Sequence, residues 1–221
     1  MPAKKRAARN KKKSKAKAAA KKQAAAAAAE RERELQSRIR NAMFLEDGKT
    51  PRNVLNDFLP FKAFSHAEFA AAIEFYAADS LPPPLLKQCF DLLKLNMQTM
   101  YEACEGWGWS DKKKMKELQS PEARFLVATT GSGADQTVCG FIHFRFSLEG
   151  EDPVLYVWEI QIGASARRQG LGKRLSQVCC EFEPCGSFGC MRLSVTTADP
   201  SVPFSQYILL TCHAHVCSLY W

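Results

Sequence analysis

Long apolar runs are missing from this chain, and their absence excludes one class of protein. No stretch of 18 consecutive apolar residues occurs in the 221 residues, although 46% of them are hydrophobic, so the sequence predicts no membrane-spanning helix. The N-terminus is rich in Lys and Ala, which argues against a secretory signal. Nine cysteines without such a signal favour reduced thiols over a disulfide framework. We therefore expect a soluble, intracellular protein with one ordinary domain and tails.

Acidic side chains are absent from residues 1–22, which hold 11 Lys and Arg. The whole chain has 31 basic and 23 acidic residues and a net charge of +8, so the remainder has 20 basic side chains against 23 acidic ones. The positive charge therefore belongs to a tail. A slightly acidic body accepts a basic peptide, whereas a basic body would repel it.

Residues 1–29 are a low-complexity segment of Lys and Ala with no apolar face to bury. We interpret the segment as a solvated tail that is disordered or partly helical. Its basic clusters, Lys4 to Arg6 and Lys11 to Lys13, also match a nuclear-import signal or a weak nucleic-acid or ribosome contact. Residues 30–57 follow as a charged helical segment, with a helix from Glu30 to Met43 that we expect to pack across the domain.

The middle of the chain predicts two helices and then two strands. Prolines at 82–84 mark a helix start, and apolar residues recur at helical spacing as far as Met100. Ser110 is the expected N-cap of a short helix over 111–118. Segments 124–130 and 136–148 flank a glycine-bearing turn and predict a β-hairpin. In its second strand Ile142, Phe144 and Phe146 share one face, and His143 and Arg145 share the other.

The most informative segment joins a strand, a basic turn and a helix. Residues 154–162 are β-branched and aromatic, which predicts a strand, and residues 167–173 read Arg-Arg-Gln-Gly-Leu-Gly-Lys before a helical pattern. Backbone N–H groups at such a turn point toward one site, where a phosphate binds. Gly170 and Gly172 lack a Cβ and allow close approach, while Arg167, Arg168 and Lys173 add positive charge for a pyrophosphate.

Arg-Arg-x-Gly-x-Gly after a strand resembles the acetyl-CoA loop of the GCN5-related N-acetyltransferase (GNAT) superfamily. Two further segments resemble the NatD-type N-alpha-acetyltransferases, which acetylate the amino termini of histone H4 and histone 2A. They are Asn96 to Glu102 with Trp107 to Trp109, and Phe141 to Phe146 ahead of Leu155 and Tyr156.

The resemblance covers residues 58–195, which we expect to form the acetyltransferase core. It implies an α/β (α+β) fold, the GNAT acyl-CoA N-acyltransferase fold, with a mixed, mostly antiparallel sheet flanked by helices. It also implies a strand within 67–78, where the Ala content alone favours a helix.

The resemblance implies that acetyl-CoA is the co-substrate and that no metal is needed. Main-chain groups of residues 160–162 would pair with the pantetheine arm like an added strand, and residues 168–173 would hold the pyrophosphate. The alternative for the turn is an ordinary basic helix cap. The cofactor-binding candidates are Ile160, Gln161, Ile162, Arg168, Gln169, Gly170, Leu171, Gly172, Lys173 and Ser194.

Glu159 is the candidate general base, because a carboxylate just ahead of the cofactor-binding residues reaches the incoming amine directly or through one water. An α-amine has a pKa of about 7.7 to 8.0, so a modest base removes its proton near neutrality. The alternative is a solvated strand carboxylate, since successive strand residues alternate between faces. The resemblance favours the catalytic role.

Four aromatic residues correspond to the walls and hydrogen-bonding groups of the peptide site. Such rings bracket a small first residue, usually Ser followed by Gly in the resembled family, and exclude bulkier ones. The first of the four also fits the apolar face of its own helix. These substrate-binding candidates are Tyr101, Trp107, Tyr156 and Trp158.

Two residues near the peptide site depart from the resembled family. Trp158 stands where the family commonly has Tyr, so a hydroxyl contact is lost. Ser147 stands where some relatives carry Asp. The negative charge for a substrate Arg would then come from Glu149, Glu151 or Asp152.

The resemblance stops after Val195, and nothing in residues 196–221 matches the aromatic helix with which the family continues. We therefore expect the fold to be incomplete at the C-terminus. A zinc site is an alternative interpretation of this end of the chain, although it has neither a Cys-x-x-Cys pair nor a regular knuckle spacing. The residues concerned are Cys185, Cys190, Cys212, His213, His215 and Cys217.

Together these patterns predict an N-alpha-acetyltransferase for histone H4 and 2A amino termini. We expect it in the nucleus and cytoplasm, away from membranes and without an obligatory auxiliary subunit. Two alternatives stay open. One is an acetyltransferase for lysine side chains, whose pKa of about 10.4 demands a stronger base, or for small amines. The other is a catalytically impaired variant that binds CoA or histones.

Overall fold

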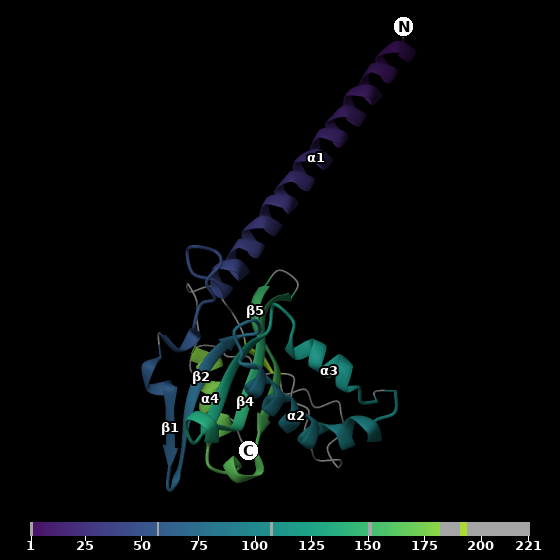
Figure 1. The fold of residues 1–221 in the computed structure, drawn as a ribbon. Helices are drawn as coiled ribbons and strands as arrows, with labels where there is room; N and C mark the ends of the chain where they lie inside the picture. Colours follow the sequence, from purple (N-terminus) through teal and green to yellow (C-terminus); the bar gives the residue numbers. More distant parts are fainter. Residues whose placement is uncertain (1, 57, 107, 150–151, 182–190, 194–221) are drawn as a thin grey trace.

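A computed structural model describes residues 2–56, 58–106, 108–149, 152–181 and 191–193. In these residues the strands form one six-stranded sheet with helices on both of its faces (Figure 1). The elements in chain order are α1 (Pro2–Met43), β1 (Ala63–His66), β2 (Phe69–Ala77), α2 (Pro83–Ala103), α3 (Asp111–Leu118), β3 (Arg124–Thr130), β4 (Thr137–Glu149), β5 (Asp152–Ile162), α4 (Leu171–Glu181) and β6 (Met191–Leu193).

The sheet follows the chain order from β1 to β6. Neighbouring strands are antiparallel from β1 to β5, and β6 is parallel to β5. The expected mixed, mostly antiparallel sheet is therefore confirmed, and so is the hairpin of β3 and β4. Residues 196–221, where the resemblance fails, lie outside the described part of the chain.

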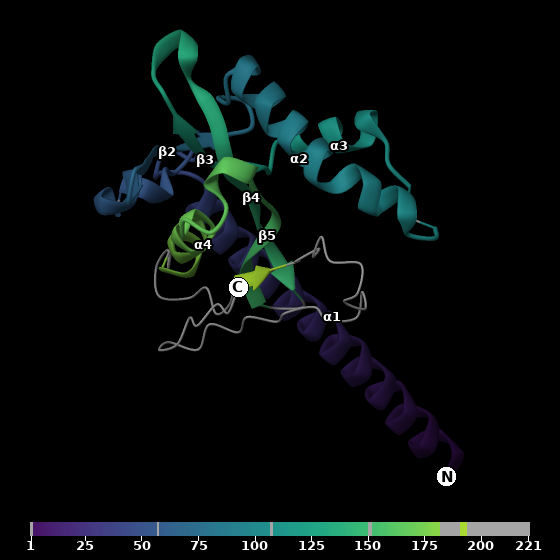
Figure 2. The same ribbon diagram turned by 90° about the horizontal axis from the view of Figure 1, so that it is seen from below.

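Two apolar clusters cover the two faces of the sheet. On one face Ile142, Phe144 and Val157 pack against α4 and the end of α1. On the other face Phe125 and Phe141 pack against α2 and α3. Figure 2 shows α4 on one side of the strands and α2 and α3 on the other. Each strand of the central sheet is thus buried on both faces, which fixes the orientation of the side chains between them.

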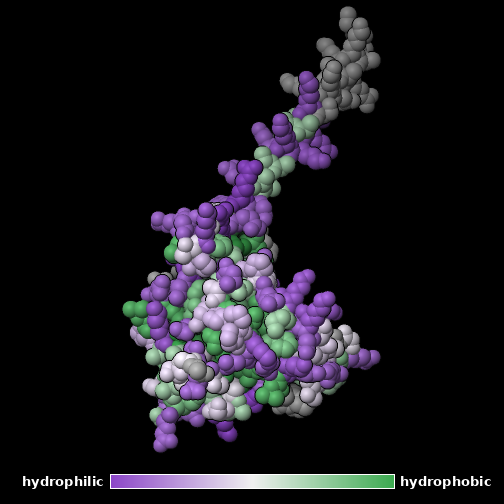
Figure 3. Space-filling view, in the orientation of Figure 1, coloured by the Kyte–Doolittle hydropathy of each residue, from purple (hydrophilic) through white to green (hydrophobic). Residues whose placement is uncertain are grey.

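Helix α1 combines an anchored end with a projecting tail. Leu35 is buried, Ala42 belongs to the apolar cluster that contains α4, and Ile39 and Met43 pack against that cluster. The rest of the helix extends away from the domain (Figure 1) and its surface is mostly hydrophilic (Figure 3). The expected helix from Glu30 to Met43 is confirmed, and high Ala content lets it continue through the tail without an apolar face.

The helices that flank the site begin where the sequence predicts. Pro83 occupies the first turn of α2, where its missing N–H has no partner to lose. Ser110 caps α3, because its hydroxyl oxygen accepts the backbone N–H of Lys113 at 3.4 Å. The strand within 67–78 is also confirmed, since β2 pairs with both β1 and β3. Strand pairing outweighs the helix propensity of Ala there.

A β-bulge in β5 shapes the region around Glu159. His143 of β4 lies opposite Glu159, while its neighbour Phe144 lies opposite Val157, so Trp158 is an extra residue in β5. Val157 is buried against the α4 face. The bulge directs Trp158 toward His143 and Arg145 on the opposite face and leaves Glu159 on that same face. In a regular strand, successive side chains alternate between faces, so Trp158 and Glu159 would have pointed to opposite faces of the sheet.

Candidate active site

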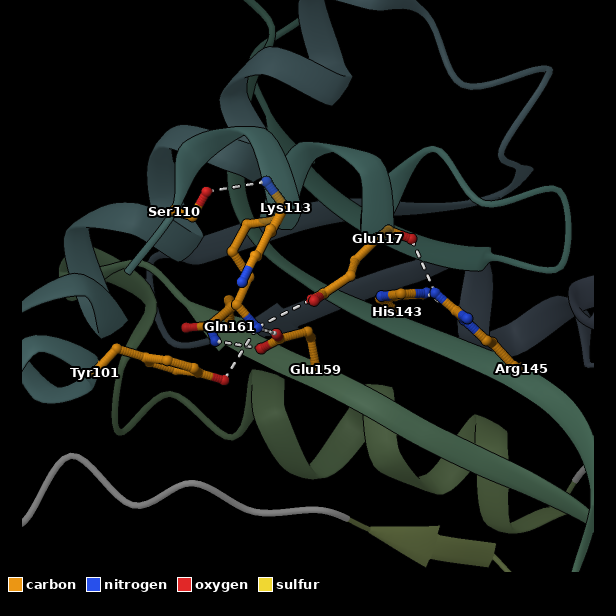
Figure 4. Close-up of polar contacts among 9 residues, drawn as sticks. Tyr101, Ser110, Lys113, Glu117, His143, Arg145, Glu159 and Gln161 are labelled. Carbon is orange, nitrogen blue, oxygen red and sulfur yellow. Dashed lines mark hydrogen bonds and ion pairs between the residues drawn. The ribbon is translucent and has the colours of Figure 1, made fainter. Parts of the chain in front are cut away.

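Glu159 has a buried, ion-paired carboxylate at the centre of the α2 and α3 face. The residue is 5% exposed. One carboxylate oxygen, Oε1, lies 3.6 Å from Nζ of Lys114 on α3, and the other, Oε2, accepts a hydrogen bond of 3.1 Å from Nε2 of Gln161. Figure 4 shows these groups converging from α3 and β5. The alternative of a solvated strand carboxylate is therefore wrong, because the bulge turns Glu159 beneath α3.

Lys114 links three oxygen atoms around the buried carboxylate. Its ammonium group donates to Tyr101 Oη and to Glu117 Oε2, both at 3.0 Å, and its side chain is 11% exposed. Burial favours the neutral amine, but the hydrogen bonds to Tyr101 and Glu117 and the charge of Glu159 outweigh it. The pKa of Lys114 is therefore raised, and the group stays positively charged.

Burial raises the pKa of the Glu159 carboxyl above its ordinary value. The positive charge of Lys114 and the hydrogen bond from Gln161 oppose this effect, and the nearby charge of Glu117 adds to it. A carboxylate whose pKa is shifted toward neutrality is a better match for general base catalysis near pH 7. Glu159 thus has the properties that its predicted role requires.

His143 is buried and neutral, and its Nε2 is occupied by Arg145. Burial lowers the pKa of His143 to about 3, with contributions from the charges of Arg145 and Lys114. Its Nε2 accepts a hydrogen bond of 3.3 Å from Nε of Arg145, and its ring stacks on Phe125 with 5.1 Å between centroids. The guanidinium of Arg145 in turn lies 4.5 Å from the ring centroid of Trp158. His143 therefore supports the arginine that holds the indole.

The structure brings three of the four predicted peptide-site residues to this face. Trp158 is 39% exposed, and its ring packs edge-on against Tyr156 with 5.5 Å between centroids. Tyr101 reaches the site through Lys114. Trp107 lies outside the described residues, as do Ser194 and Glu151, and the side chains of Glu149 and Asp152.

The second half of β5 has a free edge beside Glu159. β6 pairs with β5 only at residues 155–157, so from 158 to 162 this edge has no strand partner in the part of the chain that the structure describes. On the other edge Gly163 donates its N–H to Cys139 of β4, which directs the main-chain groups of Ile160 and Ile162 toward the free edge. The Ile162 carbonyl already accepts hydrogen bonds of 3.3 Å from Asn96 and Arg167.

The turn after β5 has the backbone of an anion cradle. Arg168 and Gly170 both have positive φ, at 60° and 87°, directly before α4 begins at Leu171. The first-turn N–H groups of a helix have no intrahelical acceptor. A Cβ at Gly172 would make only an ordinary contact with Ile162, at 3.7 Å. Protein packing therefore does not itself require glycine at 172, and the cradle fits a phosphate group.

Side chains beside the cradle come from separate parts of the chain. Arg168 and Lys173 are exposed, whereas Arg167 folds back and donates to Asn96 Oδ1 at 2.8 Å. The β1–β2 hairpin also meets the turn, where His66 Nδ1 lies 3.2 Å from Gln169 Oε1. Only two of the three basic residues predicted to face a pyrophosphate are thus free to do so.

Sequence reasoning missed Lys114, Glu117, His143 and Asn96 as functional candidates. One signal was available for the lysine. Lys114 lies four residues before buried Leu118 on α3 and therefore on its inner face, where an unpaired lysine is costly. The contacts of Asn96 join residues more than 60 positions apart, and no local pattern predicts them.

The described residues show neither a metal-binding cluster nor a membrane-spanning helix. They contain no group of three or more His, Cys, Asp or Glu side chains arranged to hold a metal ion. The cysteines and histidines considered for zinc lie outside them. No described helix is both long and apolar enough to span a bilayer.

Comparison with solved structures finds remote likenesses to acetyltransferases. An aminoglycoside acetyltransferase from an uncultured soil metagenomic sample, in complex with sisomicin, is 19% identical, with a TM-score of 0.42 over 68% of this chain and 95% of that chain. A ribosomal-protein-alanine N-acetyltransferase from Brucella melitensis biovar Abortus 2308 is 20% identical, with a TM-score of 0.40 over 60% and 82%. An aminoglycoside 6'-N-acetyltransferase complexed with coenzyme A is 20% identical, with a TM-score of 0.38 over 54% and 59%. These likenesses are too remote to indicate a substrate.

The family model is more decisive. The model of the acetyltransferase (GNAT) family matches residues 92–205, just over half of the chain. The match includes the bulged strand, the cradle and α4. The chain therefore belongs to the GNAT family of acetyltransferases, whose members bind acetyl-CoA.

Proposed function

We propose that this protein transfers an acetyl group from acetyl-CoA to the free α-amine of a protein amino terminus, as NatD-type enzymes do. The observation that carries the proposal is the buried Glu159 carboxylate at the start of the free β5 edge, which leads to the anion cradle. This arrangement supports a thioester donor and an amine meeting beside one base.

Different residues accept the proton of the amine and bind the acetyl donor. Glu159 accepts a proton from the incoming amine, directly or through one water, and Lys114 keeps the carboxylate ionised until then. Main-chain groups of residues 160–162 pair with the pantetheine arm along the free edge of β5, and residues 168–173 hold the pyrophosphate. When bound, acetyl-CoA supplies a thioester whose C–S bond breaks as the new amide bond forms.

Two features support an α-amine rather than a lysine side chain as the acceptor. The pKa of an α-amine is about 7.7 to 8.0 against about 10.4 for lysine, so one glutamate suffices for the α-amine. Tyr156 and Trp158 precede Glu159 on β5, and their aromatic side chains, which pack against each other, favour a small first residue. Histone H4 and histone 2A termini, which begin with Ser and Gly, have both properties.

The proposal also covers the partners of the protein and its location in the cell. The basic part of α1 contributes a weak, salt-sensitive contact with nucleic acid or ribosomes and a nuclear-import signal. The protein acts in the nucleus and cytoplasm without an obligatory auxiliary subunit. The slightly acidic remainder of the chain accepts basic histone tails.

Mass spectrometry of three acceptors tests the proposal. The full chain is mixed with acetyl-CoA and with a Ser-Gly-Arg-Gly peptide, with the same peptide blocked at its amino terminus, or with a blocked peptide that contains lysine. The proposal predicts one acetyl group on the α-amine of the free peptide alone. Acetylation of the blocked lysine peptide would indicate a side-chain acetyltransferase. CoA binding without any product would indicate an impaired variant and contradict the proposal.

A further inference from the structure

A chain of hydrogen bonds connects the cradle to the candidate base. Arg167 Nη2 donates to Asn96 Oδ1 at 2.8 Å, and Asn96 Nδ2 donates to Gln161 Oε1 at 2.9 Å. Gln161 Nε2 then donates to Glu159 Oε2 at 3.1 Å. Three elements contribute, because Arg167 precedes α4, Asn96 belongs to α2, and Gln161 and Glu159 belong to β5.

The chemistry of the two ends fixes the direction of every bond. A guanidinium group only donates, and an ionised carboxylate only accepts. Asn96 must therefore present its oxygen to Arg167 and its NH₂ group to Gln161. Gln161 must in turn present its oxygen to Asn96 and its NH₂ group to Glu159. Every amide dipole is thus aligned with its positive end toward the carboxylate.

We propose that Arg167, Asn96 and Gln161 form a one-way hydrogen-bonded relay that holds the Glu159 carboxylate and couples it to the acetyl-CoA loop. The inference rests on the proposed role of Glu159 as the base. Asn96 and Gln161 are positioning residues in this account, because neither needs to touch the reacting atoms.

The relay runs from an exposed bond at Arg167 to a buried one at Glu159, and burial strengthens its inner end. Gln161 is 4% exposed and Glu159 is 5% exposed, so water does not compete for the bond between them. In such surroundings aligned hydrogen bonds strengthen one another. Arg167 also donates from Nε to the Ile162 carbonyl at 3.3 Å. If phosphate binding moves the turn that contains Arg167, the same movement therefore displaces both the β5 edge and Glu159.

Other charged and titratable groups also face Glu159, and they must stay constant in a test. They lie on α2, which is also the helix of Asn96, and on α3 and β4. They are Lys114 and Glu117 on α3, Tyr101 on α2, and His143 and Arg145 on β4. The relay variants change none of these residues themselves.

Three substitutions break the relay at successive bonds. Gln161→Met keeps the length of the side chain but removes both amide groups. Asn96→Leu removes the central link, and Arg167→Met removes the donor at the loop. Gln98→Leu is the matched control, because Gln98 lies on the same helix as Asn96 and its side chain bonds only to the exposed Glu102.

The test measures the protonation of Glu159 itself. Infrared difference spectroscopy monitors it during a pH titration of the full chain. The relevant band is the one that disappears in Glu159→Gln. A hydrogen bond to the charged form lowers a pKa, so Gln161→Met should raise the pKa of Glu159 by about one pH unit. Asn96→Leu should give a smaller rise of about half a unit. The control should leave the pKa unchanged.

A double variant tests whether the loop acts through the relay. Arg167→Met should raise the pKa of Glu159 in the parent chain but add nothing to Asn96→Leu. Equal effects of Arg167→Met with and without Asn96 would overturn the inference, as would an unchanged Glu159 titration in Gln161→Met. The titration needs no turnover. If the pKa of Glu159 shifts as expected in a chain that acetylates no peptide, the relay is supported and the proposed function is contradicted.

Discussion

Single residues set the protonation state of the candidate base. The buried Glu159 carboxylate lies beside the ammonium group of Lys114, which also pairs with the partly exposed Glu117, and opposite the neutral His143 on β4. Burial and the lysine act on the carboxylate in opposite directions. This balance leads to two separate predictions. One concerns Glu159 as the base, and the other concerns Lys114, whose charge lowers the pKa of Glu159.

Glu159→Gln should lower kcat/KM for the peptide about 100-fold, because the amide cannot accept the proton of the amine. Acetyl-CoA affinity should stay unchanged, since the cradle is untouched. The measurement is steady-state kinetics together with calorimetric titration of acetyl-CoA. Glu122→Gln is the control, as Glu122 is exposed and lies at the margin of the site. Equal losses in both variants would contradict the assignment.

Lys114→Met should move the acid limb of the pH profile of kcat/KM to higher pH by about one unit. The ammonium favours the ionised carboxylate, so its removal raises the pKa of Glu159 further. Activity near neutral pH therefore falls, while activity at high pH recovers. Lys114→Arg keeps the charge and should keep the limb in place, as should Lys113→Met on the exposed side of α3. A uniform loss at every pH would refute this role.

At the residue scale the sequence predicts the base but not its partners. Glu159 is a candidate because it lies just ahead of the cofactor-binding residues in a strand and loop that resemble a known family. Its partners Lys114, Asn96 and His143 come from other elements, and their contacts depend on how α2 and α3 cross the sheet. The resemblance also gives no indication that Arg167 turns away from the cradle.

At the scale of elements, the turn before α4 combines backbone strain with positive charge. Arg168 has a φ of 60°, a conformation that costs a residue with a Cβ about 1 kcal/mol or more. Gly170 adopts a φ of 87° without that cost. From this strain at a non-glycine residue we expect the Arg168 side chain to have a role in binding.

Two substitutions at Arg168 separate these effects. Arg168→Gly relieves the strain and should leave the melting temperature unchanged or slightly higher, because a more flexible unfolded chain offsets part of the gain. Arg168→Ala keeps the strain and should give no such gain. Both should weaken acetyl-CoA binding several-fold, since both remove a charge. Calorimetry and thermal unfolding provide the measurements. Unchanged affinity in both variants would show that Arg168 does not face the phosphates.

Element type was predictable wherever spacing or capping decided it. The proline start of α2 and the Ser110 cap of α3 are examples. β2 was ambiguous, because its Ala content favours a helix and only pairing with β1 and β3 makes it a strand. The bulge at Trp158 was not predictable, since the register across two strands decides it.

At the scale of the whole molecule, the residues that carry most of the net positive charge and the residues that stabilise the core lie in different parts of the chain. The basic residues concentrate in the projecting part of α1, while Leu35 and Ala42 join the core at its other end (Figure 1). Binding through the tail and folding of the domain should therefore respond to different changes.

Removal of residues 2–29 should leave the melting temperature and peptide acetylation unchanged, because this segment buries no side chain among its described positions. The truncation should abolish salt-sensitive binding to duplex DNA or RNA, measured by fluorescence anisotropy at two salt concentrations. Leu35→Ala should instead lower the free energy of unfolding by about 2 kcal/mol and keep the nucleic-acid binding. Loss of stability on truncation would contradict this separation.

A crystal structure of the full chain with a bisubstrate, in which CoA is joined to the α-nitrogen of a Ser-Gly-Arg-Gly peptide, tests the central claim most directly. We expect the diphosphate at the N–H groups of residues 170–173, the pantetheine along the free edge of β5, and the joined nitrogen within reach of Glu159. A diphosphate bound elsewhere, or a peptide on the far side of the sheet from Glu159, would contradict the account.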